Sequence, residues 1–133
     1  MERFAQLLQE LGVLINVPLK PDKNGVCQMK INNALDVQLE DQPTKDRILV
    51  GCFICDLPAG KFREEVLKEA LKANSNYPRK GTLSYSERNN KLVLFDYLYY
   101  VNIRTDTLED YLTGFFETAN AWRESLERGL SHP

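Results

Sequence analysis

Histidine is almost absent from the sequence. The only one of 133 residues is His132, next to the last position. Histidine is the usual side-chain base near neutral pH, so Ser-His-Asp and Cys-His arrangements have no base here. The sequence also lacks the glycine-rich phosphate-binding, H-E-x-x-H and G-x-S-x-G motifs. We therefore expect no enzymatic activity and no cofactor.

Cysteine is scarce as well. The three cysteines are an odd number, which argues against a framework of disulfides. Cys52 and Cys55 form a C-x-x-C pair, but inside a β-rich run, where residues three apart point to opposite faces. A zinc site would usually need a second Cys/His pair. We expect buried cysteines that act as small apolar side chains, and no metal site.

Long apolar runs and an excess of basic charge are also missing. No run approaches the 18 residues of a membrane span, and the N-terminus does not resemble a signal peptide. Lys and Arg number 17 against 19 Asp and Glu, a net charge of −2 that suits nucleic-acid phosphates poorly. We expect a single cytoplasmic domain over residues 1–133, with 130–133 as a flexible tail, no nucleic-acid partner and no membrane insertion.

Hydrophobic periodicity supplies the elements that are present. Spacings of three and four residues predict three helices, and alternating or continuous apolar runs predict five strands. Thr105 is expected to cap the last helix. The fold class is α+β, in the order α-β-β-β-α-β-β-α, with a twisted antiparallel sheet flanked by helices. The expected helices cover residues 2–15, 61–73 and 105–129, and the expected strands cover 26–31, 35–40, 47–56, 81–86 and 91–103.

The last strand has apolar or aromatic residues at both odd and even positions from Leu92 to Val101. A strand with one solvated face should alternate. A partner subunit that covers the second face is the interpretation we favour. The other interpretation is a central strand sandwiched between the chain's own helices.

Without catalytic chemistry, the sequence indicates a protein that binds another protein. An extended peptide has two ways to use such a domain. It can add a strand to an exposed sheet edge, and its apolar side chains can fill grooves between helix and sheet.

Several segments resemble a known family in their order and spacing. They include the opening helix Phe4–Gly12, the Leu57-Pro58 pair, the middle helix Leu67–Asn74, the strand Gly81–Tyr85 and the last helix Phe115–Trp122. In these features the chain resembles the class I type III secretion chaperones, the SycE/CesT-like group. It is most similar to the small chlamydial chaperones that escort the gatekeeper CopN.

The resemblance implies a dimer that binds the N-terminal segment of a secreted effector or gatekeeper and keeps it secretion-competent without ATP. It places effector binding on the opening helix and first sheet, at Phe4, Leu7, Leu8, Leu11, Val26, Gln28, Val37 and Leu39. It places the dimer interface on the middle helix and second hairpin, at Val66, Ala70, Leu83, Tyr85, Val93, Phe95, Tyr97 and Tyr99.

The run from Tyr97 to Tyr100 is bulky for a strand that meets its own copy across a two-fold axis. A related but different chaperone chain would suit it better, so homodimer and heterodimer both stay open. A second functional hypothesis is a regulatory protein that binds RNA polymerase or its sigma factor. Acidic character and exposed apolar surface would permit that role, although no residue demands it.

Overall fold

A single five-stranded sheet organises the molecule. The structure is a computed structural model that describes residues 2–31, 34–76 and 80–133. The elements are α1 (Glu2–Ile15), β1 (Val26–Ile31), β2 (Leu35–Gln42), η1 (Pro43–Lys45), β3 (Arg47–Asp56), α2 (Lys61–Asn74), β4 (Thr82–Ser86), β5 (Lys91–Tyr99), η2 (Tyr100–Asn102) and α3 (Thr105–Glu127). This confirms the expected α+β class and the order of the elements.

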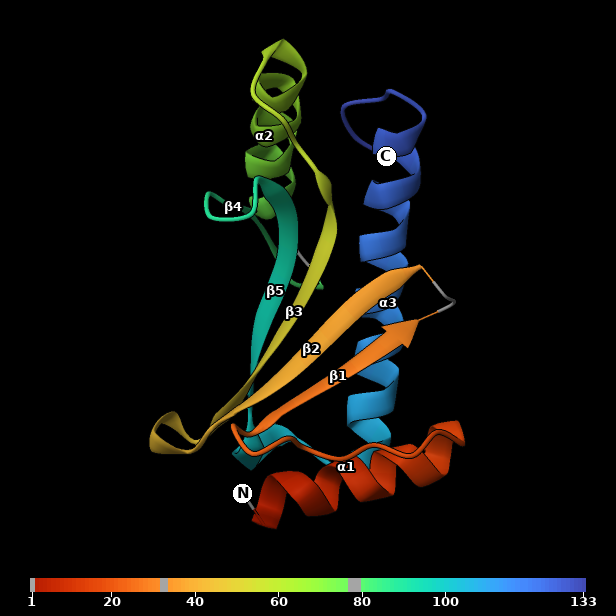
Figure 1. Cartoon of the computed structure of the whole chain (residues 1–133). Helices are drawn as coiled ribbons and strands as arrows, with labels where there is room; N and C mark the ends of the chain where they lie inside the picture. The colour runs from red at the N-terminus through yellow and green to blue at the C-terminus, as the bar shows by residue number, and fades with distance from the viewer. Residues whose placement is uncertain (1, 32–33, 77–79) are drawn as a thin grey trace.

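The strands lie in the order β1-β2-β3-β5-β4, and every neighbouring pair is antiparallel. β3 is therefore the central strand, which agrees with its nearly continuous apolar sequence. Alternate residues of each strand point to one face, and these residues are the buried ones in β2 and β3. In Figure 1, β1 and β2 cross in front of α3, and α1 runs across the foot of the molecule.

All three helices pack on the buried face. The core is one cluster that joins Phe4 and Leu8 of α1, Val66 of α2 and Phe115 of α3 to the inward residues of the strands. The Arg63 side chain of α2 donates to the Tyr85 hydroxyl of β4 at 2.6 Å. The Tyr111 hydroxyl of α3 donates to the Asp96 carboxylate of β5. Among the described residues, no helix lies over the other face, which we call the open face.

The last strand is shorter than predicted. β5 ends at Tyr99 and the chain turns into η2, whereas the sequence pattern predicted a strand to Ile103. The backbone N–H of Tyr100 donates to the Asp46 carbonyl at 3.1 Å, and its hydroxyl donates to the Asp41 carboxylate at 2.7 Å. These contacts anchor Tyr100, and the turn of η2 is closed by the Ile103 N–H, which donates to the Tyr100 carbonyl at 3.1 Å. β2 is longer than predicted and extends to Gln42, two residues beyond its predicted end.

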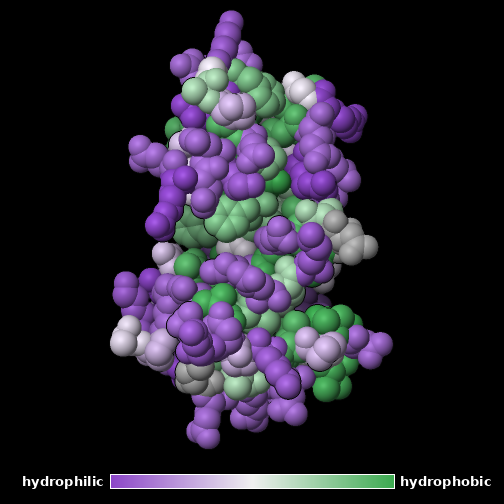
Figure 2. All heavy atoms as spheres, in the orientation of Figure 1, coloured by the Kyte–Doolittle hydropathy of each residue, from purple (hydrophilic) through white to green (hydrophobic). Residues whose placement is uncertain are grey.

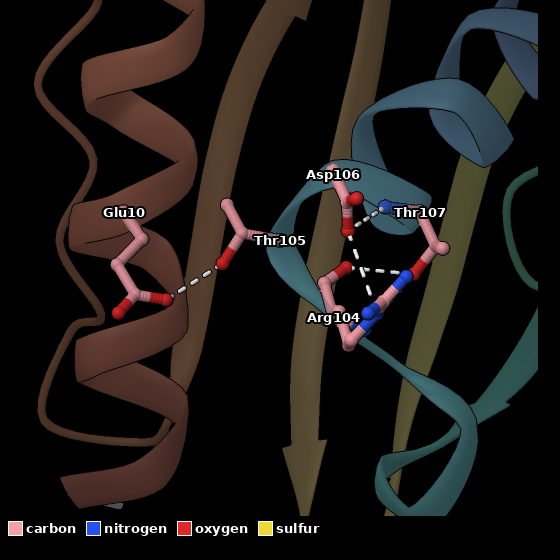
Figure 3. A network of polar contacts seen from close by, with 5 residues as sticks. All are labelled: Glu10, Arg104, Thr105, Asp106 and Thr107. Atoms are coloured by element: carbon pink, nitrogen blue, oxygen red, sulfur yellow. Dashed lines mark hydrogen bonds and ion pairs between the residues drawn. The ribbon is translucent and has the colours of Figure 1, made fainter.

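The start of α3 also differs from the prediction. Thr105 is the first residue of the helix and Arg104 is its cap, with the Arg104 N–H donating to the Thr107 hydroxyl at 2.9 Å. The Thr105 hydroxyl instead donates to the Glu10 carboxylate at 2.6 Å and so ties α3 to α1 (Figure 3). The helix ends at Glu127, two residues before its predicted end. The predicted loop residues 32–33 and 77–78 lie outside the described part of the chain.

None of the described helices has both the length and the apolar content needed to cross a bilayer.

Candidate partner-binding surfaces

The open face carries an apolar patch over its central strands. In the pairing of β3 with β5, Leu49 lies opposite Tyr97 and Phe53 lies opposite Val93. Phe95 lies between Val93 and Tyr97 on the same face of β5. We call Leu49, Phe53, Val93, Phe95 and Tyr97 the open-face patch. Phe53 is 41% exposed and Tyr97 is 37% exposed. The patch lines a hollow of about 370 Å³, and Figure 2 shows apolar surface over the middle of this face.

Arg47 orders the aromatic end of this patch. Its guanidinium lies 3.7 Å from the centre of the Tyr97 ring and donates to the Tyr99 hydroxyl at 3.3 Å. Its Nε donates to Gln42 at 2.6 Å, which holds the stacked geometry. The Phe95 and Tyr97 rings meet edge to face at 5.8 Å. The aromatic side chains are therefore held in place on the surface without a helix above them.

The residues expected at a dimer interface fall into two groups. Val93, Phe95, Tyr97 and Tyr99 share the open face and are partly exposed. Three others belong to the core between the helices and the sheet: Val66, Ala70 and Leu83. Tyr85 lies on the helix side, where its hydroxyl donates to Asn90 at 2.5 Å. The structure thus brings together four of the eight residues on one accessible surface. It adds Leu49 and Phe53 of β3, which the sequence analysis did not single out.

A second apolar surface lies at the end of α1. Val13 is 77% exposed, Leu14 is 51% exposed and Val17 is 47% exposed. We call these three residues the α1 ridge. Val13 and Val17 line a hollow of about 770 Å³. Figure 2 shows this apolar surface over the end of α1, at the lower right. Exposed aliphatic side chains that share one place on a surface are typical of a protein-binding site.

Gly12 fixes the shape of this region. The Val17 N–H donates to the Gly12 carbonyl at 2.9 Å, so the chain folds back over the last turn of α1. A Cβ at position 12 would stand 2.5 Å from the Val17 carbonyl oxygen. Only glycine permits this close approach. Because Gly12 has no side chain, the chain can fold back over α1, and this places Val17 beside the other residues of the α1 ridge.

The edge strand β1 lies beside the ridge. Below its edge is a hollow of about 250 Å³ between α1, β1 and α3, lined in part by Ile15, Met29, Ile31, Leu112 and Phe116. Val17 lines both this hollow and the larger one. The two hollows therefore share Val17 of the α1 ridge as part of their walls. Together with the free edge they form one continuous surface at the α1 end of the molecule.

The eight residues expected to bind an effector lie in two environments. Five are fully buried and contact the chain's own core: Phe4, Leu8, Leu11, Val37 and Leu39. Leu7 packs against that core while partly exposed, and Val26 and Gln28 lie in the edge strand β1. Because a helix buries its main apolar stripe in its own domain, the accessible residues are those just beside the stripe. Val13 is such a residue, and Val17 follows the end of the helix. Neither was among the candidates predicted from the sequence.

The cysteines make no site. All three are free, Cys27 and Cys52 are buried, and Cys55 is half-buried. Burial raises the pKa of the Cys52 thiol to about 12 and also raises the pKa values of the other two thiols. Within the described ranges, no group of three or more Cys, His, Asp and Glu side chains has the arrangement of a metal site.

The comparisons with known proteins agree with this architecture. The model of the Tir chaperone protein (CesT) family matches residues 6–123. The chain belongs to this family, and it is a chaperone of the type III secretion class that the sequence resembled. No curated protein sequence is significantly similar to the chain.

Solved structures share the fold at low sequence identity. A chain in the crystal structure of the ExsC–ExsE complex superposes with a TM-score of 0.79 and 18% identity, covering 92% of each chain. The HopA1–SchA chaperone–effector complex gives 0.74 and 22% identity over 90% of this chain and 91% of the other. The Yersinia pestis type III secretion chaperone SycH, in complex with a fragment of YscM2, gives 0.70 and 16% identity over 87% and 96%.

Proposed function

We propose that the chain binds an extended N-terminal segment of a secreted effector or gatekeeper protein at the surface formed by the α1 ridge and the β1 edge. The family match supports a chaperone role. The single observation that carries the proposed site is the coincidence of exposed aliphatic side chains, two hollows that share Val17, and a strand edge that is open beyond Val26. An extended segment uses all three, because its backbone pairs with the edge while its apolar side chains enter the hollows.

We also propose that the open-face patch joins the chain to a second chaperone subunit. A partly aromatic surface over the middle of a sheet exposes apolar area that a second subunit would remove from water. The partner is either another copy or a related chain. The surface offers no chemistry of its own, so the protein acts by binding in the bacterial cytoplasm and not as an enzyme. No described feature favours the alternative of an RNA polymerase or sigma-factor partner.

Co-purification with the N-terminal segments of secreted proteins from the same organism tests the proposed site. The wild-type chain and a Val13→Glu/Leu14→Glu variant are each co-expressed with every segment, and the mass of each complex is measured. We expect one segment to form a stable complex with the wild type. The ridge variant should lose it, because two carboxylates would have to be buried against an apolar partner.

A matched control is available on another helix. Leu71 of α2 is 71% exposed but lies away from the ridge. Leu71→Glu should retain the segment. Equal retention by the ridge variant would contradict the proposed site, and recovery of RNA polymerase subunits in place of secreted segments would support the alternative function.

A further inference from the structure

The two edges of the sheet are closed to different extents. At the β4 edge, the N–H and the carbonyl of Leu83 face away from β5, and the Asn74 side chain of α2 hydrogen-bonds to both. Its Nδ2 donates to the Leu83 carbonyl at 2.9 Å, and its Oδ1 accepts from the Leu83 N–H at 2.8 Å. This amide takes the place of a neighbouring strand. Since β4 has only five residues, little of that edge is left for a partner.

At the β1 edge, Asp22 hydrogen-bonds to both the N–H and the carbonyl of Val26, which face away from β2. The Asp22 N–H donates to the Val26 carbonyl at 2.8 Å, and its Oδ1 accepts from the Val26 N–H at 3.0 Å. The same oxygen accepts from the Asn24 N–H at 2.8 Å, which fixes the carboxylate in position. The N–H and the carbonyl of Val26, at the start of this edge, are therefore not available to pair with an added strand.

The rest of the β1 edge is open. The Asp41 N–H donates to the Gly25 carbonyl, and Val26 lies opposite Glu40, so the ladder to β2 uses the peptide groups of residues 25, 27, 29 and 31. Those of Gln28 and Lys30 point away from β2. No described residue hydrogen-bonds to them. The two residues form a window of free donors and acceptors, which we call the edge window.

The window also fixes where a partner's side chains go. A residue of an added strand opposite Gln28 or Lys30 points to the open-face side, and one opposite Met29 points to the helix side. The hollow of about 250 Å³ lies on that side, between Met29, Leu112 and Phe116. An apolar side chain fits there. A carboxylate suits the position across from Lys30, because the exposed Lys30 ammonium, which lies 3.8 Å from the Asp36 carboxylate, has room for a second acidic partner.

We propose that Asp22 is a register-setting residue that limits strand addition to the edge window and thereby selects a polar–apolar–polar segment. This inference rests on the proposed function, since it describes how the same segment would bind. The partner's apolar residue enters the hollow opposite Met29. Its two polar neighbours lie across from Gln28 and Lys30. Without Asp22, the edge would accept a longer strand in more than one register.

Amide hydrogen exchange of the free protein tests the first half of this proposal. The Val26 amide should exchange about tenfold or more slowly than those of Gln28 and Lys30, because only Val26 has a partner on the free edge. Asp22→Ala should remove this protection, and Asp22→Asn should keep it because its amide oxygen still accepts. Equal exchange of the three amides in the wild type would overturn the proposal whatever the chaperone binds.

A synthetic strand tests the second half. The probe is a fluorescein-labelled peptide, Ser-Glu-Thr-Val-Glu-Val-Thr-Glu-Ser, and its control has serine in place of both valines. The probe should slow exchange at Gln28 and Lys30, and the control should not. Asp22→Ala should bind the probe about three- to tenfold more tightly, because the Val26 N–H becomes free to donate to the added strand, while the backbone N–H of residue 22 still donates to the Val26 carbonyl.

Two results would overturn the assignment. One is binding of the probe without protection of Gln28 and Lys30, and the other is an unchanged affinity in Asp22→Ala. Absence of any binding would also reject the edge window as an acceptor of alternating strands. These results bear only on how the β1 edge takes part. The chaperone function itself is tested separately, by retention of a secreted segment in the wild type and its loss in the α1 ridge variant.

Discussion

The Tyr111 hydroxyl joins α3 to the sheet through a polar contact. It donates to the Asp96 carboxylate of β5. Burial raises the pKa of Tyr111, and the hydrogen bond to Asp96 and its negative charge raise it further. The neutral phenol is therefore the form that the fold requires. A polar pair at this position specifies how α3 sits on the strand, because a shifted helix would leave the carboxylate without its donor.

Tyr111→Phe removes the donor and leaves the ring in place. We expect the free energy of unfolding to fall by about 1–3 kcal/mol, because the partly buried Asp96 loses a hydrogen-bond partner. Urea denaturation at pH 7 measures the change. Tyr97→Phe is the control, since the Tyr97 hydroxyl has no hydrogen-bond partner among the described residues. A loss of the same size in both variants would show that the Asp96 contact is not the cause.

Cys52 predicts a dependence of stability on alkaline pH. Its pKa is raised to about 12 in the folded chain, mainly by burial, whereas an exposed thiol titrates near about 8.5. Between these two values the unfolded chain loses the proton first, so stability decreases as the pH rises. From pH 8 to pH 10 this thiol should contribute a loss of about 1–2 kcal/mol.

The measurement is urea denaturation in a reducing buffer at pH 8 and pH 10, for the wild type and Cys52→Ala. The variant should be less stable at pH 8 but should lose less on going to pH 10. Cys55→Ala, at a half-buried position, should change the pH dependence less. An identical loss in the wild type and Cys52→Ala would contradict the prediction.

At the scale of elements, the end of α1 depends on the close approach at Gly12. Gly12→Ala would place a methyl group 2.5 Å from the Val17 carbonyl oxygen, so the returning chain would have to move. We expect a loss of about 1–3 kcal/mol in the free energy of unfolding, together with weaker binding at the α1 ridge. Thermal denaturation and co-purification of the secreted segment measure the two effects. Gln6→Ala, at an exposed position of the same helix that lines neither hollow, should change neither.

The sequence allowed most elements to be predicted because their periodicities are local. The end of β5 was missed because it depends on contacts with Asp41 and Asp46, far away in the chain. The α1 surface was predicted from the strongest apolar stripe. That stripe packs into the chain's own core at Leu8 and Leu11, and the exposed residue Val13 lies beside it. Only the packing of α1 in the folded chain shows which of its apolar residues are buried and which are exposed.

At the scale of the whole molecule, the described helices cover one side of the sheet and leave the other side open. The open-face patch explains why β5 has apolar residues on both faces: Leu94 points into the core and Phe95 points out. The sequence indicated that β5 has more apolar residues than one face can hold, but it did not indicate which neighbouring strand contributes to the same patch. The contribution of Phe53 depends on the register between β3 and β5, which no local pattern reveals.

Phe95→Asp tests the proposed subunit contact. A carboxylate in the middle of the open-face patch should abolish association, because it would be buried against another apolar surface, while the fold is retained. Light scattering measures the mass, and circular dichroism checks the fold. Ser84→Asp, on the exposed rim of the same face, should have a smaller effect. A mass unchanged by Phe95→Asp would exclude this face as the interface.

The same experiment on the wild type distinguishes the two kinds of partner. If the bulky run from Tyr97 to Tyr100 disfavours self-association, the chain alone should be monomeric and should pair with a related chaperone. A homodimer that is stable on dilution would contradict the heterodimer hypothesis.

The one-sided sheet also determines how many clients an assembly can hold. The hollow beneath β1 is on the helix-covered side, so two chains joined through their open faces would each keep a client surface directed outward. The assembly would then be bivalent. A long segment that contacts both sites pays the entropic cost of association only once, and its second contact forms at a high effective concentration. Retention of a client would therefore depend on the spacing between its two binding stretches as much as on either stretch alone.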